Sequence, residues 1–277
     1  MDLQTFIIQA LAEDVGDGDH TSLACIKSGQ KGKARLLVKE NGIVAGVDLA
    51  QQIFQIVDHD IQFNKIKNDG DAIVLNDIVM TVDGDVQSIL KAERLVLNCM
   101  QHMSGIATNT AKYVKQLSGL STKILDTRKT TPLCRTIEKM AVKIGGGYNH
   151  RYGLYDMILI KDNHVDFAGG INAAILRTIE YIKSTGKNLK IEIETRNLKE
   201  VQEVLQTGNV NRILLDNMHP ELLSEAVQII NRQFETEASG GITLDTIRKY
   251  AETGVDYISV GALTHSVKSL DLSLKAF

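Results

Sequence analysis

Short apolar strands and amphipathic helices alternate along the chain from about residue 120 onward, and this alternation limits the possible folds more than any other feature. The clearest helix is 219–233, where Leu222, Leu223, Ala226, Val227 and Ile230 share one face. A regular β-α alternation predicts a parallel sheet covered by helices. The ends of successive strands lie about one strand, one helix and two loops apart, which favours a barrel over an open sheet. The candidate strands are KILD at 123–126, MILIK at 157–161, IEIE at 191–194, ILLD at 213–216, TEAS at 236–239 and YISVG at 257–261.

The chain before residue 120 follows a different pattern. Up to about residue 85 it contains short strand-like runs such as ARLLVKE at 34–40, and the turn signals Asn41-Gly42 and Asp83-Gly84. From Val86 to Leu117 apolar residues recur at helical spacing, with an interruption near Ser104-Gly105. We therefore expect a separate α+β region, then helices and a domain boundary.

Composition excludes several classes of protein. The 277 residues are 43% hydrophobic, which is enough for a sizeable core, and 31 basic and 34 acidic residues leave a formal charge of −3. This balance gives no reason to expect nucleic acid or a membrane surface as a partner. We find neither a secretory signal nor a membrane span, so we expect a cytoplasmic protein. Three scattered cysteines argue against both a disulfide framework and a structural zinc site.

Reactive residue types gather at the carboxyl ends of the predicted strands. In an α/β barrel those ends converge on one mouth, where active sites are built. The sequence therefore predicts one site that contains two acids, several cations and two glycine turns. The residues at or just past a strand end are Asp126, Arg128, Lys161, Glu194, Asp216, Ser239 with Gly240, and Gly261.

Two segments bring cations to this mouth. DTRKTTPLCR at 126–135 contains Arg128 and Lys129, and guanidinium groups match carboxylates and phosphates bidentately. GGGYNHRYGLYD at 145–156 places three glycines before His150 and Arg151, so that the backbone can approach a ligand closely. The plain alternatives are a solvated loop with ordinary surface bases and a flexible connector. Lys161, at a strand end in KDNH, must reach water or an anion.

Glu194 and Asp216 end two successive strands, so their carboxylates can share one hard cation. Glu192 points to the same side as Glu194, and strand geometry does not decide between them, although proximity to the mouth favours Glu194. The alternative is that an acid caps a helix or pairs with Arg128 or Lys161.

The last two strand-loop units, ASGGI at 238–242 and VGALTHS at 260–266, predict a phosphate cup of backbone N–H groups. The alternative is tight turn geometry, with Thr243 as an ordinary N-cap.

The motifs DTRKTTP, GGGYNHR, KDNH, IEIE, LLDN, SGG and VGALTHS, together with AERLVLNCMQHMSGIAT at 92–108, resemble the quinolinate phosphoribosyltransferase family in order and spacing. The resemblance covers most of the chain. It implies an N-terminal α/β sandwich domain at 1–105, to which the tail 267–277 returns, and an incomplete α/β barrel of about seven strands at 106–266. It also implies a homodimer with shared active sites, and leaves open whether dimers assemble further.

The resemblance also implies roles for individual residues. Arg128, Lys129 and Arg151 match the basic pocket of the family, with His150 beside them, and Arg94 matches an arginine supplied across the dimer interface. Lys161 matches a lysine near the substrate and pyrophosphate, and Glu194 and Asp216 match the acids that hold the ribose hydroxyls and the metal. We expect Lys129, Lys161, Glu194 and Asp216 to be catalytic. Ser239, Gly240, Gly261 and His265 match the cup for the 5-phosphate. Leu133-Cys134 departs from the family, where a glycine and then an apolar residue are expected, which puts the local turn in doubt.

The implied reaction joins quinolinate to phosphoribosyl pyrophosphate with magnesium, and releases nicotinate mononucleotide, pyrophosphate and carbon dioxide for NAD biosynthesis. One alternative is a related phosphoribosyltransferase with another acceptor, such as a paralogue associated with molybdate transport or a nicotinate-specific enzyme. A second alternative is a non-catalytic phosphosugar-binding or assembly protein.

Overall fold

The computed structural model describes residues 2–277, and the chain divides into two compact units. The first unit contains the chain up to Ala111, with Thr130–Gly146 and Leu263–Phe277. The second contains Lys112–Lys129 and Gly147–Ala262. The division on the long helix thus falls a few residues beyond the expected boundary at 105, and residues 130–146 belong with the first unit.

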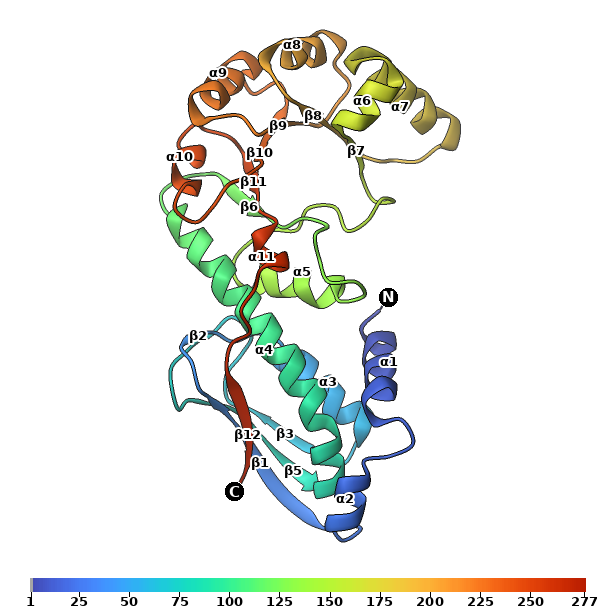
Figure 1. Ribbon diagram of the computed structural model, residues 1–277, viewed down its shortest axis with the longest axis vertical. Coiled ribbons are helices and arrows are strands. Elements are labelled where there is room, and N and C mark those ends of the chain that lie inside the picture. The colour runs from blue at the N-terminus through green and yellow to red at the C-terminus, as the bar shows by residue number, and fades with distance from the viewer. Residues whose placement is uncertain (1) are drawn as a thin grey trace. The chain divides into compact units, whose positions relative to one another are not determined.

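The second unit is the incomplete α/β barrel that the sequence predicts. Its strands form one parallel sheet in the order β6-β11-β10-β9-β8-β7, and helices α6 to α10 lie on the outer side of this arc (Figure 1). The strands are β6 Lys123–Leu125, β7 Ile158–Ile160, β8 Ile191–Thr195, β9 Arg212–Asp216, β10 Glu235–Ser239 and β11 Tyr257–Ser259. The helices are α6 Asp162–Ala168, α7 Ile171–Thr185, α8 Leu198–Thr207, α9 Pro220–Ile230 and α10 Ile247–Ala251.

The barrel sheet has six strands in the part of the chain that the structure describes, where the resemblance implied about seven. Beside β6, Tyr148 forms an isolated parallel bridge with Leu125. The ladder ends there because the next donor, the backbone N–H of His150, turns to the carboxylate of Asp126 at 2.8 Å. The Asp126 side chain therefore accepts the N–H that would otherwise have extended a seventh strand.

Helix α9 illustrates how local sequence sets the barrel elements. Pro220 occupies the first turn, where its missing N–H costs nothing, and Asn231 ends the helix in the left-handed region at φ 44°. Leu223, Ala226 and Ile230 are buried on the predicted face. The predicted helix at 219–233 is confirmed within three residues at its end.

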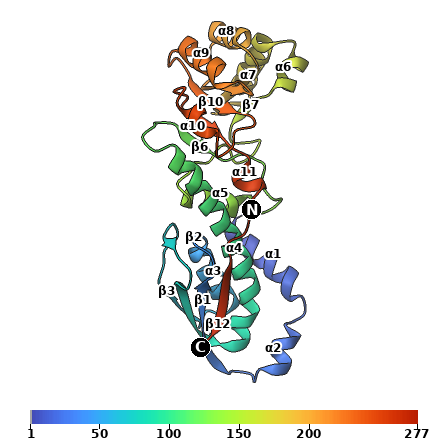
Figure 2. The same ribbon diagram turned by 60° about the vertical axis from the view of Figure 1, so that its left-hand side comes forward.

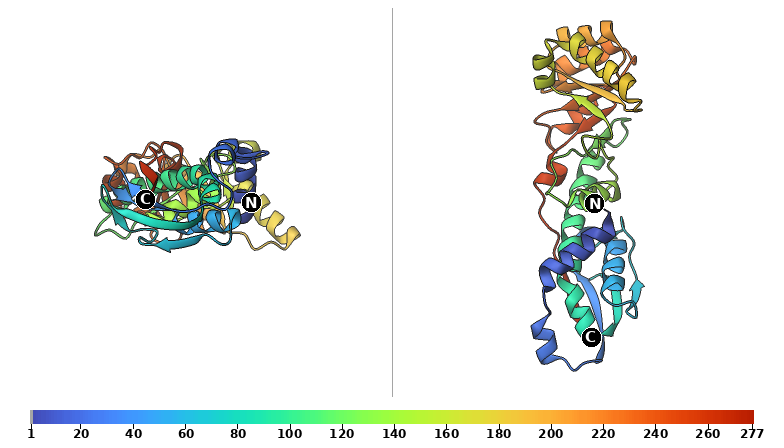
Figure 3. Two further views of the ribbon diagram at one scale, coloured as in Figure 1. Left: turned by 90° about the horizontal axis from the view of Figure 1, so that it is seen from below. Right: turned by 90° about the vertical axis from the view of Figure 1, so that its right-hand side faces the viewer.

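The first unit is built around an antiparallel sheet in the order β12-β1-β5-β3. The final strand β12, Leu272–Ala276, pairs with β1, Lys31–Val38, and α4 runs along the sheet (Figure 2). The right-hand view of Figure 3 also places the C-terminus at this sheet. The other strands are β2 Gly42–Ile43, β3 Gln62–Lys65, β4 Ala72–Ile73 and β5 Ile78–Asp85. The helices are α1 Leu3–Val15, α2 His20–Cys25, α3 Val47–Val57, α4 Val86–Gln116, α5 Arg135–Ile144 and α11 Ala262–His265, of which α4 and α11 continue into the other unit.

The predicted interruption near Ser104-Gly105 is wrong, because α4 is one continuous helix over 31 residues. Gly105 is required by packing instead. A Cβ at this position would lie 2.3 Å from the backbone oxygen of Lys268, so only glycine lets the returning tail approach. Ser104 is buried, and its hydroxyl accepts the N–H of Ala45 at 2.9 Å. Both residues are explained by neighbours distant in sequence.

Among residues 2–277, no helix is both long enough and apolar enough to cross a membrane.

Candidate active site

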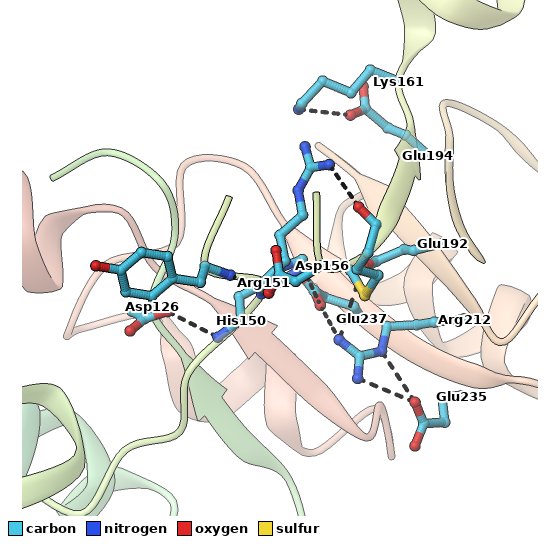
Figure 4. A network of polar contacts seen from close by, with 12 residues as sticks. Asp126, His150, Arg151, Asp156, Lys161, Glu192, Glu194, Arg212, Glu235 and Glu237 are labelled. Atoms are coloured by element: carbon cyan, nitrogen blue, oxygen red, sulfur yellow. Dashed lines mark hydrogen bonds and ion pairs between the residues drawn. The ribbon is translucent and has the colours of Figure 1, made fainter. Parts of the chain in front are cut away.

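Two acids and a lysine stand at the carboxyl ends of neighbouring barrel strands. Glu194 is near the end of β8, Asp216 ends β9, and Lys161 directly follows β7. The Nζ atom of Lys161 lies 3.3 Å from Oε2 of Glu194 (Figure 4). Burial raises the pKa of Glu194, Lys161 works against this shift, and the nearby charge of Asp216 adds to it. The two acids therefore repel each other, and a bound cation would relieve that repulsion.

Two arginines from different loops lie close to each other. Arg128 follows β6, and Arg151 belongs to the irregular segment 149–157. Burial and the charge of Arg128 lower the pKa of Arg151, so the two guanidinium groups lie close enough to repel. Arg151 donates from Nη1 to the backbone oxygen of Met157 at 3.1 Å, and its guanidinium points toward Lys161 and Glu194 in Figure 4. A pair of like charges held in this way is suited to a ligand with more than one negative charge.

The turn after β10 exposes backbone at the same end of the sheet. Gly240 has φ 99°, and a Cβ there would lie 2.2 Å from Oδ1 of Asn217, so the turn requires glycine. The backbone oxygen of Ser239 accepts the N–H of Asn217 at 2.8 Å. Gly261 lies two residues after the end of β11. These features fit the predicted phosphate cup.

Eight of the expected site residues besides the two glycines belong to the barrel unit: Arg128, Lys129, His150, Arg151, Lys161, Glu194, Asp216 and Ser239. The remaining two belong to the first unit. Arg94 is an exposed residue of α4, and His265 ends α11, where its Nδ1 lies 2.7 Å from the hydroxyl of Ser266.

Behind the mouth, the barrel interior contains charged residues that the sequence analysis did not assign to the site. Glu237 of β10 is fully buried, and its Oε2 accepts from Nη1 of Arg212 at 2.9 Å. Glu192 of β8 is also fully buried, and its Oε2 lies 3.0 Å from Nε2 of His150. Glu192 therefore faces inward to His150, while Glu194 stands nearer the mouth. The alternating acids of IEIET and ETEAS are the signal that could have revealed this interior.

The ring of His150 is fixed on both sides. Nδ1 accepts the N–H of Arg151 at 2.7 Å, and Nε2 faces Glu192 and, at 3.4 Å, Glu237. Burial lowers the pKa of His150, but the two carboxylates outweigh burial and raise it to about 9. Because Nδ1 accepts the amide proton of Arg151, Nε2 carries a ring proton and directs it toward the two carboxylates.

The carboxylates of the interior differ in their tendency to ionise. Burial and the neighbouring Glu237 raise the pKa of Glu192 to about 7. Burial also opposes ionisation of Glu237, but His150 and Arg212 outweigh it and keep the pKa of this acid below its usual value. His150, Glu192 and Glu237 have the spacing of a metal site. Arg212 already supplies positive charge there, so the chain itself offsets the negative charge of the buried carboxylates.

Comparisons with known proteins agree with this architecture. Residues 19–104 match the model of the quinolinate phosphoribosyl transferase N-terminal domain, and residues 106–275 match that of its C-terminal domain. The chain is 47% identical to quinolinate phosphoribosyltransferase [decarboxylating] 1b of Nicotiana tabacum, over 99% of this chain and 82% of that protein. It is 40% identical to a probable nicotinate-nucleotide pyrophosphorylase [carboxylating] of Bacillus subtilis, over 99% and 93%.

Solved structures show the same fold. The nicotinate-nucleotide pyrophosphorylase from Francisella tularensis superimposes with a TM-score of 0.92 at 38% identity, over 99% of this chain and 96% of that one. With both domain models matched and full-length relatives well above 30% identity, the chain belongs to the quinolinate phosphoribosyltransferase family.

Proposed function

We propose that the chain transfers the phosphoribosyl group of phosphoribosyl pyrophosphate to quinolinate with decarboxylation, as a step of de novo NAD biosynthesis. The observation that carries the proposal is the gathering of cations and acids at the carboxyl end of one parallel sheet, in a chain whose relatives have this name. The products are nicotinate mononucleotide, pyrophosphate and carbon dioxide.

The basic side of the mouth binds the acceptor. Quinolinate carries two carboxylates, and Arg128 with Arg151 supplies two guanidinium groups that repel each other until an anion lies between them. Lys129 and His150 complete this pocket, and Arg94 comes from the partner protomer of a homodimer. Ser239, Gly240, Gly261 and His265 hold the 5-phosphate of the donor. We also place this activity in the cytoplasm, which cell fractionation tests.

The acids serve the transfer step. The pyridine nitrogen forms a bond to the anomeric carbon of ribose while the bond to pyrophosphate breaks, and the electron pair leaves with pyrophosphate. Positive charge develops on the ribose ring, and the carboxylates of Glu194 and Asp216 stabilise it. Lys161 holds Glu194 in place at 3.3 Å and attracts the departing anion. No side chain of the protein forms a covalent bond to the sugar.

Decarboxylation follows on the charged pyridinium ring. The bond to the carboxylate next to the ring nitrogen breaks, and its electrons remain on the ring carbon beside the positive nitrogen. A proton from water then takes the place of carbon dioxide. Arg128 and Arg151 hold the carboxylates during this sequence.

Glu194 and Asp216 would hold a magnesium ion. Carboxylate oxygens are the ligands this ion prefers, and the two acids repel each other without it. When bound, magnesium would neutralise the departing pyrophosphate.

Product analysis tests the proposal. Mixing the protein with quinolinate, phosphoribosyl pyrophosphate and magnesium should release carbon dioxide and nicotinate mononucleotide in equal amounts. Nicotinate in place of quinolinate should give no turnover. Use of nicotinate would favour a related enzyme with another acceptor. Binding of phosphoribosyl pyrophosphate without turnover of either acceptor would favour a non-catalytic phosphosugar-binding protein.

A further inference from the structure

The interior of the barrel unit is ionic where most α/β barrels are apolar. Branched aliphatic side chains usually fill such a barrel. Here Glu192 and Glu237 are both fully buried, and the side chain of Arg212 is only 14% exposed. We call these three residues the buried charge cluster.

Contacts on one side fix the arginine of the cluster. Arg212 donates to Glu237 at 2.9 Å and, from Nη2, to Glu235 at 3.1 Å (Figure 4). Its guanidinium carbon also lies 4.0 Å from the ring centroid of Tyr257, which adds a cation-π contact. Arg212 therefore presents a fixed positive charge to the two buried acids.

On the other side the acids face His150. The Nε2 atom lies 3.0 Å from Glu192 and 3.4 Å from Glu237. The contact with Glu192 has the distance of a hydrogen bond but not its angles, since neither oxygen of this carboxylate has a hydrogen-bond partner among the described residues. A buried carboxylate in that condition costs stability.

The ring of His150 connects the cluster to the mouth. Its Nδ1 accepts the backbone N–H of Arg151 at 2.7 Å, and the backbone N–H of His150 donates to Asp126 at 2.8 Å. Residues 149–157 have no helix or strand to orient them. The orientation of the peptide between His150 and Arg151, and so the direction of the Arg151 side chain, depends on these contacts.

Stability alone does not account for such an interior, because buried ion pairs replaced by apolar residues often leave a protein equally or more stable. We propose that Glu192, Glu237 and Arg212 are positioning residues, which hold the ring of His150 and thereby orient Arg151 toward the carboxylates of the substrate. Their role rests on the proposed function, since Arg151 is placed there as a ligand for quinolinate. None of the three touches the substrate.

The test compares two acids that flank the same arginine. Glu192→Leu removes the nearer of the two carboxylates that face His150 but leaves the Arg212–Glu237 pair intact, so the variant should fold with unchanged or higher stability. We expect its KM for quinolinate to rise by about tenfold or more, with kcat and the KM for phosphoribosyl pyrophosphate changed by less than about threefold. Glu192→Gln retains an oxygen facing Nε2 and should restore most of the lost affinity.

Glu235→Leu is the matched control. Glu235 also contacts Arg212, but its side chain is 41% exposed and lies on the far side of Arg212 from His150 (Figure 4). Its loss should therefore leave the KM for quinolinate within about twofold of wild type. An equal rise in both leucine variants would show a general effect of disturbing the barrel and would overturn the proposal. So would an unchanged KM in Glu192→Leu.

A double-mutant cycle then asks whether Glu192 acts through Arg151. In an Arg151→Ala background, Glu192→Leu should have almost no further effect on the KM for quinolinate, whereas independent residues would give multiplied effects. Turnover of quinolinate by the wild-type protein separates the proposed function from the positioning role, because absence of turnover counts against the proposed function alone. In that case crystal structures of the variants test the positioning role. The peptide of Arg151 should be displaced in Glu192→Leu and unmoved in Glu235→Leu, and an unmoved peptide in both variants would refute the positioning role.

Discussion

At the scale of single residues, the arginine pair at the mouth is the feature most directly open to test. We expect Arg128→Ala or Arg151→Ala to reduce kcat/KM for quinolinate by at least about tenfold, or about 1.4 kcal/mol, because a dianion loses a paired cation. Steady-state kinetics measure this. Arg248→Ala is the control, since Arg248 of α10 pairs with Glu252 just after that helix, and its loss should leave kcat/KM for quinolinate unchanged. Wild-type kinetics in both mouth variants would remove these residues from the site.

Leu133, where the family resemblance implied a glycine, has a backbone conformation that glycine adopts more readily. It has φ 65°, in the left-handed region, and its side chain is exposed. A side chain in that region costs roughly 1–2 kcal/mol, partly offset by the greater unfolded-state entropy of glycine. We expect Leu133→Gly to raise the free energy of unfolding by about 0.5–1 kcal/mol in urea titrations. The same change at Leu176, an exposed residue of α7, should lower it by about 1 kcal/mol.

Cys99 gives the chain a stability that depends on pH. Burial, with a contribution from Cys134, raises the pKa of the Cys99 thiol from 9.0 to about 12. The unfolded chain loses this proton first, so the contribution of Cys99 is complete below pH 9 and is lost as the pH rises toward 12. Unfolding free energies measured between pH 8 and about 10.5 should fall less steeply in Cys99→Ala than in wild type. The exposed Cys25 is the control, and Cys25→Ala should keep the wild-type slope.

At the scale of elements, α4 carries a position where packing opposes helix propensity. Alanine forms helices better than glycine by about 1 kcal/mol, yet a Cβ at Gly105 would collide with the backbone oxygen of Lys268. We expect Gly105→Ala to destabilise the protein by about 1–3 kcal/mol, as measured by thermal and urea unfolding. Lys112→Ala, at an exposed position of the same helix, should have little effect. Increased stability in Gly105→Ala would mean that the tail does not approach there.

The same helix shows where sequence reasoning reaches its limit. The barrel strands were predicted to within about two residues, because parallel strands buried on both faces appear as short apolar runs between turn signals. The break at Gly105 was wrong because the reason for that glycine lies more than 160 residues away in the chain. A local signal cannot distinguish a helix break from a point of close approach.

The site residues were likewise predictable from local sequence signals but not from contacts between distant strands. Strand ends identified Lys161, Glu194 and Asp216, whose side chains do gather. Glu192, Arg212 and Glu237 face one another because of the strand order and the register, which pairs Glu192 with Arg212 and Arg212 with Glu235. Glu237 is two residues beyond Glu235 on β10, so it lies on the same side of the sheet. Sequence alternation gives the side of a strand but not its neighbours, so the buried charge cluster was missed.

At the scale of the whole molecule, the proposed homodimer predicts complementation between two inactive variants. If Arg94 acts in the partner's site and Lys161 in its own, a mixed dimer of Arg94→Ala and Lys161→Ala has one intact site. Random exchange of protomers should then restore about a quarter of wild-type activity. Mixing each variant with itself is the control. No recovery after verified exchange would place Arg94 in its own protomer's site or outside the site.

The pairing of β1 with β12 has a consequence for how the protein is made. Residues 34–38 lie beside residues 272–276, so this segment of the nascent chain pairs with one that is synthesised more than 230 residues later. During synthesis β1 has β5 on one side and an open edge on the other. Such edges recruit foreign strands, so slow translation through the barrel segment should favour aggregation, and chaperones that shield extended chain should be needed until β12 arrives.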